Sequence, residues 1–399
     1  MHLQFPASVS RFAHGRRSLT GLVAATLLCG SLGATANASD LPSAAPSETG
    51  VDAAPLSELS SWLDAQGYDV RSLMVVKDGQ VIMERYTQDL GRQHNYELYS
   101  VTKTVTALLA GLLIEEGKIT LDASVADVIA TLRPDLAEHV ADKEEVTLAH
   151  LLSMSSGLAY DFDPEGDPIY YGAEDRLALI ADTPVAWEPG SAFDYTDVNP
   201  VFAAAMLEAA AGEPLAEYAE RRLFEPLGME NASWQRADDK GLVSAGWGLR
   251  LRSMDLAKLG QLLIDQGRFD GEQIVPEGWI AQMTTPRAAR DFGYYLWLGH
   301  IVDTTPSFDM MGFKGQFVTA LPERDAVVVM TAMLPIDGGL RHSKNVRIFR
   351  NVVNDYVLPA LDGEGSAEAD AALEDEVAAR ASSTPTPGVF VDPTDEPQS

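Results

Sequence analysis

Strand-like patterns lie near both ends of the chain, and helical patterns fill the region between them. Residues 77–80, Lys-Asp-Gly-Gln, are typical of a hairpin turn. An antiparallel sheet that takes strands from both chain ends, flanked by helices and with a helical subdomain inserted at about 119–290, satisfies this order. The predicted fold class is therefore α+β. The expected strands are 72–76, 81–83, 294–301, 313–321 and 326–331.

Ser100 and Lys103 stand at the start of a strongly apolar helical pattern that continues to Ile114. Positions i and i+3 share a helix face, so the lysine nitrogen can reach the serine hydroxyl. A serine needs an adjacent base to become a nucleophile, and a lysine can be that base if burial or nearby cations keep part of it neutral. The alternative is an N-cap serine beside a solvated lysine. Because this helix is apolar almost all round, we expect it to be buried, and a buried Lys103 needs a specific partner.

Four segments, the first of which contains this pair, together resemble one protein family. They are Leu-Tyr-Ser-Val-Thr-Lys at 98–103, Glu-Gly-Lys-Ile-Thr-Leu-Asp at 116–122, the Thr-x-x-His-Leu-Leu and Ser-Gly-Leu elements within 146–158, and Pro-Gly-Ser-Ala-Phe-Asp-Tyr at 189–195. Together they resemble the serine β-lactamase and penicillin-binding-protein superfamily. The resemblance is strongest to the class C-like branch, which holds esterases and 6-aminohexanoate-dimer hydrolases. It implies a β-lactamase/transpeptidase-like fold with the site between the sheet and the helical subdomain.

The resemblance also implies catalytic roles. Ser100 would be the nucleophile and Lys103 its partner. Tyr195 would carry protons between Ser100 and the leaving group, a role that suits a tyrosine near a lysine charge. The backbone N–H groups of Ser100 and Gln316 would form the oxyanion hole.

Two motifs depart from the family pattern. The second motif is often Tyr-x-Asn, but this chain has Asp197 in place of the asparagine. An ionised aspartate cannot donate a hydrogen bond to a substrate carbonyl, so Asp197 is expected to pair with Lys103 or to face solvent. In the third motif, Phe313 stands where a cation or imidazole is usual, and Lys314 follows one position late, on the other face of the expected strand. Gly315 keeps the close backbone approach that the site requires.

The departures bear on the substrate. Loss of the usual cation favours neutral esters or amides over β-lactams that carry a carboxylate. Tyr170 lies in the inserted region expected to cover the site, where it either lines an acyl pocket or belongs to a small aromatic core. With Asp197, Phe313, Lys314 and Gly315, it completes the expected substrate-binding set.

The chain ends are expected to lie outside the catalytic domain. Arginines precede an apolar run at 19–33 and Ala-Asn-Ala at 36–38, which predicts a signal peptide over 1–38 that is cleaved after Ala38, and a secreted or periplasmic protein. Residues 39–55 are expected to be a leader and 56–360 the hydrolase domain. Residues 361–399 are expected to be an acidic, mostly disordered tail with one helix over 367–379.

Composition excludes several functions. The formal charge is −30, with acidic residues spread through the body, which argues against nucleic acid and anionic membranes as partners. The one cysteine, Cys29, falls in the signal peptide, so the mature chain would have neither disulfides nor thiol catalysis. The apolar run at 19–33 is too short to predict a membrane span, and none is expected in the mature chain. No metal spacing or nucleotide-binding fingerprint occurs, so no metal and no cofactor are expected.

The sequence therefore predicts a serine hydrolase that cleaves a small ester or amide through a covalent acyl-enzyme on Ser100. A non-catalytic binding protein with the same fold is the main alternative, motivated by Asp197 and Phe313. A D-alanyl peptidase or β-lactamase would be an enzyme of the same kind with a different substrate. The sequence does not specify an oligomeric state.

Overall fold

The structure is a computed structural model that describes residues 40–87, 90–162, 166–170, 172–234, 237–335 and 341–381. All of these residues belong to one compact unit, Asn37–Ser399. The expected signal peptide and its cleavage site lie outside the described residues.

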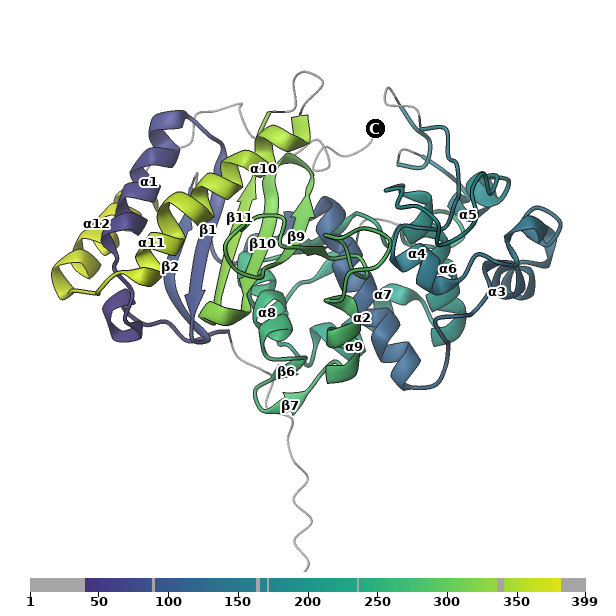
Figure 1. Ribbon diagram of the computed structural model, residues 1–399, viewed down its shortest axis with the longest axis horizontal. Helices are drawn as coiled ribbons and strands as arrows, with labels where there is room; N and C mark the ends of the chain where they lie inside the picture. Colours follow the sequence, from purple (N-terminus) through teal and green to yellow (C-terminus); the bar gives the residue numbers. More distant parts are fainter. Residues whose placement is uncertain are drawn as a thin grey trace, which may run out of the picture. The chain divides into compact units, whose positions relative to one another are not determined.

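The main sheet has six strands in the order β2-β1-β11-β10-β9-β8, and every neighbouring pair is antiparallel (Figure 1). Its first two strands come from the N-terminal part of the chain and the other four from the C-terminal part, so the predicted α+β architecture is confirmed. The strands are β1 Val70–Lys77, β2 Gln80–Tyr86, β8 Trp297–Leu298, β9 Phe308–Gly312, β10 Gln316–Leu321 and β11 Ala326–Ala332.

Strands β1 and β11, neighbours inside the sheet, have buried side chains on both faces. Along β1, Leu73 and Val75 join one apolar core, whereas Met74 and Val76 join the other, because successive side chains of a strand point to opposite faces. Helices α1, α10, α11 and α12 lie on the first face, and α2 and α8 lie on the second (Figure 1). This double burial explains the continuous apolar runs of β1 and β11.

The β1–β2 hairpin turns at the predicted position. Lys77 pairs with Gln80, and the two residues between them, Asp78 and Gly79, have φ values of 51° and 69°. Positive φ at both central positions is the signature of the type I′ turn, which suits Asp-Gly.

Helices dominate the described chain between β2 and β8. α2 carries Lys103 of the Ser-x-x-Lys motif, and helices α3 to α9 lie in the region 119–290 where the insertion is expected. β4, β5 and the β6–β7 hairpin lie in the same region, and β3, which precedes α2, completes a three-stranded sheet ordered β3-β5-β4. The helices are α1 Ala54–Gln66, α2 Thr102–Glu115, α3 Val125–Leu132, α4 Leu148–Leu152, α5 Arg176–Ala181, α6 Val198–Ala211, α7 Leu215–Ala219, α8 Ser253–Ile264, α9 Glu277–Met283, α10 Arg341–Asn351, α11 Leu358–Asp362 and α12 Ala367–Ala381. The small strands are β3 Tyr96–Glu97, β4 Ser233–Trp234, β5 Leu249–Leu251, β6 Arg268–Phe269 and β7 Glu272–Gln273.

Both ends of the described chain pack more closely on the body than we expected. Residues 42–44 run beside β2, although 39–55 was interpreted as a leader. The helix expected over 367–379 is present as α12, but it is docked: Leu373 is buried, and Arg380 pairs with Asp64 of α1 at 2.8 Å. The helix was expected, but its contact with α1 was not.

Helix α2 is held tightly because it has almost no exposed face. Gly111 lies against the indole of Trp279, whose Nε1 donates a hydrogen bond to the Ala107 carbonyl at 2.8 Å. A Cβ atom at Gly111 would stand 2.1 Å from Trp279 Cδ1, so this position has no room for a side chain.

We expect Gly111→Ala to lower the free energy of unfolding by at least about 1–3 kcal/mol, because the buried, hydrogen-bonded Trp279 cannot move aside. The midpoint of urea unfolding measures this loss. Gly278→Ala in α9 is the matched control, since its Cβ meets nothing within 4 Å and alanine favours the helix by up to about 1 kcal/mol. Equal stability of the two variants would contradict the packing described for Gly111.

Candidate active site

Ser100 and Lys103 meet as their spacing predicts. Ser100 lies in a 3₁₀ turn, Tyr99–Val101, that leads directly into α2. Its Oγ is 3.0 Å from Lys103 Nζ, and Ser100 is half-buried whereas Lys103 is 2% exposed. The alternative of a solvated lysine is therefore excluded by the structure.

The Lys103 ammonium is surrounded by acceptors. Besides Ser100 Oγ, it donates to the carbonyl oxygen of Gly246 at 2.9 Å and pairs with Asp197 Oδ1 at 2.6 Å. An ammonium has three N–H donors, and three acceptors lie around Nζ. Lys103 thus links α2, the N-terminus of α6 and the segment before β5.

Two opposing effects act on the pKa of Lys103. Burial alone would lower it, because a low-dielectric surrounding disfavours the charged form. The Asp197 carboxylate and, after it, the Tyr195 side chain raise the pKa, and they prevail, so the pKa of Lys103 lies above its ordinary value. A lysine becomes a neutral base more easily when cations lie near it. Among the described residues, the charged group beside Lys103 Nζ is instead the Asp197 carboxylate.

Asp197 is placed between two donors. Its Oδ1 faces Lys103, and its Oδ2 accepts a hydrogen bond from the hydroxyl of Tyr170. The Tyr170 ring packs on Trp247, with centroids 4.6 Å apart. Of the two possibilities that the sequence left open for Asp197, the structure shows the ion pair with Lys103. Tyr170 contacts this pair, so it does not belong only to a separate aromatic core.

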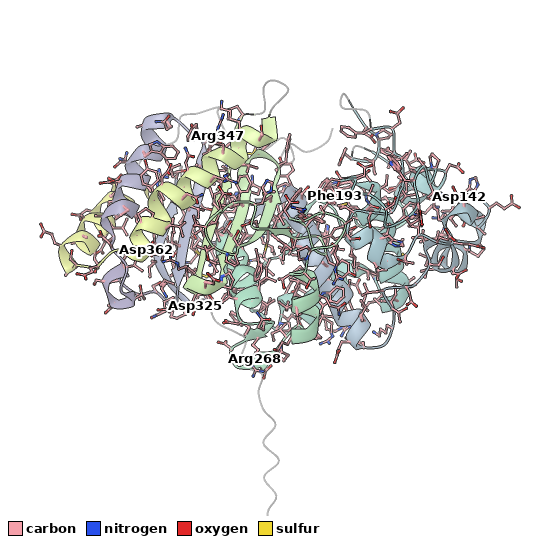
Figure 2. All side chains as sticks on the ribbon, in the orientation of Figure 1. Asp142, Phe193, Arg268, Asp325, Arg347 and Asp362 are labelled. Atoms are coloured by element: carbon pink, nitrogen blue, oxygen red, sulfur yellow. The ribbon has the colours of Figure 1, made fainter. Side chains whose placement is uncertain are left out.

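Tyr195 lies on the exposed side of Lys103. Lys103 Nζ is 5.1 Å from the centre of its ring, and the ring stacks on Trp297 at 6.0 Å. Trp297 also contacts Phe193, which Figure 2 shows between the strands and the helical insertion. The side chain of Tyr195 thus lies beside Lys103 and packs on Trp297.

The backbone before Ser100 is held in an uncommon conformation. Tyr99 has φ 47°, in the left-handed region that a residue with a side chain seldom adopts. The buried Glu97 carboxylate accepts hydrogen bonds from the backbone N–H groups of Tyr99 at 3.2 Å and Gly248 at 2.9 Å. Glu97 therefore ties the turn Tyr99–Val101 to the segment that carries the Gly246 carbonyl.

Sequence reasoning missed both Gly246 and Glu97. A backbone carbonyl has no residue signature, so nothing in the sequence points to Gly246. Glu97 offered one usable signal, a carboxylate three residues before the candidate nucleophile in an otherwise apolar segment.

Gln316 lies close to the turn that carries Ser100. It is the first residue of β10 and pairs with Gly312 at the end of β9. A Cβ on Gly312 would stand 2.4 Å from the carbonyl oxygen of Leu98, so β9 approaches the start of the turn as closely as backbone can. The Gln316 side chain turns inward to the carbonyl of Ala332 at 2.5 Å. The backbone at Gln316 is thus on the side of the sheet that borders Ser100.

Residues 313–315 do not continue the strand, contrary to the sequence prediction. Lys314 has φ 60° and Gly315 φ 106°, values outside the β region, and the three residues form the turn between β9 and β10. Phe313 is 36% exposed and its ring meets that of Tyr99 at 5.7 Å. Lys314 Nζ lies 5.5 Å from the centre of the Tyr99 ring. The argument from alternating strand faces therefore does not apply to Lys314.

Gly315 is required for a reason other than the one expected. Its positive φ suits glycine, and an added Cβ would press on Ala332 Cβ at 2.9 Å and Leu334 Cδ1 at 3.0 Å. The close approach is to the end of β11, on the protein side of the turn.

Two general features concern ligands and membranes. Within the described ranges, no three His, Cys, Asp or Glu side chains are grouped so that they could hold a metal ion. In the same ranges, no helix is both long and apolar enough to cross a membrane.

The fold agrees with that of known proteins. Residues 63–349 match the family described as Beta-lactamase. A protein of Salmonella paratyphi A named "Putative D-alanyl-D-alanine carboxypeptidase" is 24% identical, and the alignment covers 85% of this chain and 96% of the relative. The chain therefore belongs to the Beta-lactamase family and is a serine hydrolase.

Solved structures show the same fold. "Putative 6-aminohexanoate-dimer hydrolase from Bacillus anthracis" has a TM-score of 0.64 at 22% identity, covering 80% of this chain and 89% of that one. "EstCE1, a hydrolase with promiscuous acyltransferase activity" has a TM-score of 0.59 at 21% identity, covering 74% and 97%.

Proposed function

We propose that the protein hydrolyses small neutral esters or amides through an acyl-enzyme on Ser100. The observation that carries this proposal is the contact of Ser100 Oγ with a buried, charged Lys103, which also faces the Tyr195 ring. A serine that is only solvated or that only caps a helix does not require a buried ammonium group beside its hydroxyl.

The reaction begins when Ser100 Oγ attacks the carbonyl carbon. The hydroxyl proton passes to Tyr195, which gives its own proton to the leaving oxygen or nitrogen, so no proton remains on the enzyme. The backbone N–H groups of Ser100 and Gln316 bind the developing oxyanion. Water then attacks the acyl-enzyme by the same path in reverse and releases the acid.

The charges around Ser100 support a neutral substrate. Asp197 neutralises Lys103, and Phe313 takes the place of the cation that the family's third motif usually supplies. The exposed ring of Phe313 beside Tyr99 offers apolar contact to an acyl or leaving group. Lys314, whose Nζ lies near the Tyr99 ring, is a cation on this surface, so the proposal of a neutral substrate rests on Asp197 and Phe313.

A second candidate is a D-alanyl carboxypeptidase, since a relative that aligns with 85% of the chain bears that name. Release of D-alanine from a peptide that ends in D-Ala-D-Ala, measured beside hydrolysis of a neutral p-nitrophenyl ester, distinguishes the two substrate classes.

Intact-mass spectrometry after exposure to a fluorophosphonate ester tests the proposed nucleophile. One adduct, mapped to Ser100 and absent from Ser100→Ala, is expected. The same spectrum gives the mass of the secreted chain, for which we propose cleavage after Ala38. A folded protein that takes up no adduct and turns over no ester or peptide would favour the non-catalytic binding protein instead.

We expect Tyr195→Phe to lower kcat by about 10²–10⁴-fold, because phenylalanine keeps the ring on Trp297 but cannot carry a proton. Steady-state hydrolysis of the p-nitrophenyl ester measures it. Tyr356→Phe, on the far face of the sheet beside Trp62, is the control and should retain full activity. A Tyr195→Phe enzyme with unchanged kcat would remove Tyr195 from the proton path.

A further inference from the structure

The three acceptors around Lys103 Nζ constrain what this side chain can do. A charged lysine that donates to Ser100 and Gly246 and is ion-paired with Asp197 has no lone pair to offer to the Ser100 proton. To act as a base, it would first have to lose a proton and one of these contacts. These contacts hold Nζ in one position as a charged ammonium group.

The Asp197 carboxylate fits its two neighbours better than an amide would. Lys103 and Tyr170 both present donors to it, and aspartate has an acceptor oxygen for each. An asparagine would have to turn its NH₂ group toward one of the two donors. Asp197 is also the N-cap residue of α6, where the helix dipole favours a negative charge.

The other ionisable groups around this pair do not replace Asp197. Tyr195 faces Lys103 from the exposed side, and Tyr170 faces Asp197 from the insertion. Tyr295 lies nearby, where burial raises its pKa and the charges of Tyr195 and Asp197 add to this effect. Burial and Asp197 likewise raise the pKa of Tyr170, so it remains a hydrogen-bond donor. Among these groups, Asp197 is the carboxylate that contacts Lys103.

We propose that Asp197 is a positioning residue that keeps Lys103 an ammonium, so that Lys103 stabilises negative charge on Ser100 Oγ instead of accepting its proton. The inference rests on the proposed function of Ser100 as nucleophile. It assigns Asp197 and Tyr170 to the control of charge at the nucleophile, whereas the sequence placed them in substrate binding. It also leaves Tyr195 as the group that receives the Ser100 proton.

Two readouts test this role, one of which needs no turnover. The chain has eight lysines, so ¹⁵N-lysine labelling gives a short list of ammonium signals, and Lys103→Met identifies that of Lys103. We expect the Lys103 ammonium signal to persist in the wild type as the pH is raised from 7 to 9.5 and to disappear within that range in Asp197→Asn. The second readout is the pH profile of kcat/KM for a p-nitrophenyl ester. Between pH 7 and 9.5, it should change less than about twofold in the wild type but fall more than about tenfold in Asp197→Asn.

Asp194→Asn is the matched control. It removes one negative charge from the same loop, but its side chain is exposed and contacts neither Lys103 nor Ser100 in the structure. Both readouts should match the wild type. If Asp197→Asn does not fold, Asp197→Ser serves in its place with the same expected direction.

An unchanged Lys103 signal in a folded Asp197 variant would overturn the inference. An equal fall of kcat/KM between pH 7 and 9.5 in Asp194→Asn and Asp197→Asn would also overturn it. Failure of the proposed function looks different. In that case the wild type forms no fluorophosphonate adduct, while the ammonium signal still reports whether Asp197 holds the charge of Lys103.

Discussion

Replacing Ser100 with alanine is expected to lower kcat/KM for a neutral ester by at least about a thousandfold. Alanine removes the oxygen that forms the acyl-enzyme and leaves the remaining site in place, since the Lys103 contacts with Gly246 and Asp197 do not involve Ser100. The measurement is steady-state hydrolysis of a p-nitrophenyl ester, with single-turnover analysis of acyl-enzyme formation.

Ser61→Ala is the control, because Ser61 is exposed on α1 and its hydroxyl donates a hydrogen bond to Glu376 of α12. It should retain wild-type turnover. If Ser100→Ala kept more than about a tenth of the activity, the acyl-enzyme on Ser100 would be refuted and another nucleophile would have to be found.

Replacing Lys103 with methionine is expected to impair both turnover and folding. The apolar side chain fills similar space but leaves the partly buried Asp197 without its cation, which costs about 3 kcal/mol of unfolding free energy. The pKa of Lys103 is raised in the folded state. The charged lysine therefore contributes its full stabilisation below the ordinary lysine pKa of 10.5, and this contribution decreases only at higher pH. The deficit should therefore stay constant from pH 6 to 9 in urea titrations.

The double variant Lys103→Met/Asp197→Asn separates the ion pair from packing. Removing the orphaned charge should restore at least about 1 kcal/mol of stability without restoring turnover. A double variant that is less stable than Lys103→Met would show that Asp197 does not depend on Lys103 for its place in the fold.

The sheet could be predicted from sequence because its strands alternate or run continuously apolar. β1, β11 and the Asp78-Gly79 turn each follow a local rule that the fold obeys. The contact of Ser100 with Lys103 could be predicted for the same reason, since one helical turn fixes it. The α12 contacts could not, because an acidic, alanine-rich segment gives no sign of which surface will bury Leu373.

The turn at 313–315 shows where local reasoning fails. Phe-Lys-Gly between two apolar strands has the composition of a strand, and only the left-handed φ of Lys314 makes it a turn. The ion pair of Asp197 with Lys103 was open for a different reason. It joins residues 94 positions apart, so it depends on how the insertion packs on α2 and not on either segment alone.

The two chain segments that the sequence assigned to a leader and a tail both border strand β2, which is an edge of the six-stranded sheet. Val81 donates a backbone hydrogen bond to Pro42 at 2.7 Å and accepts one from Ala44 at 3.1 Å, while α12 packs against the same strand. An open edge presents unpaired N–H and C=O groups that recruit strands from other molecules. The opposite edge, β8, is only two residues long. These terminal segments therefore protect the protein from edge-to-edge aggregation. Removing them to obtain a minimal catalytic domain would expose β2 as an edge strand that can pair with other molecules.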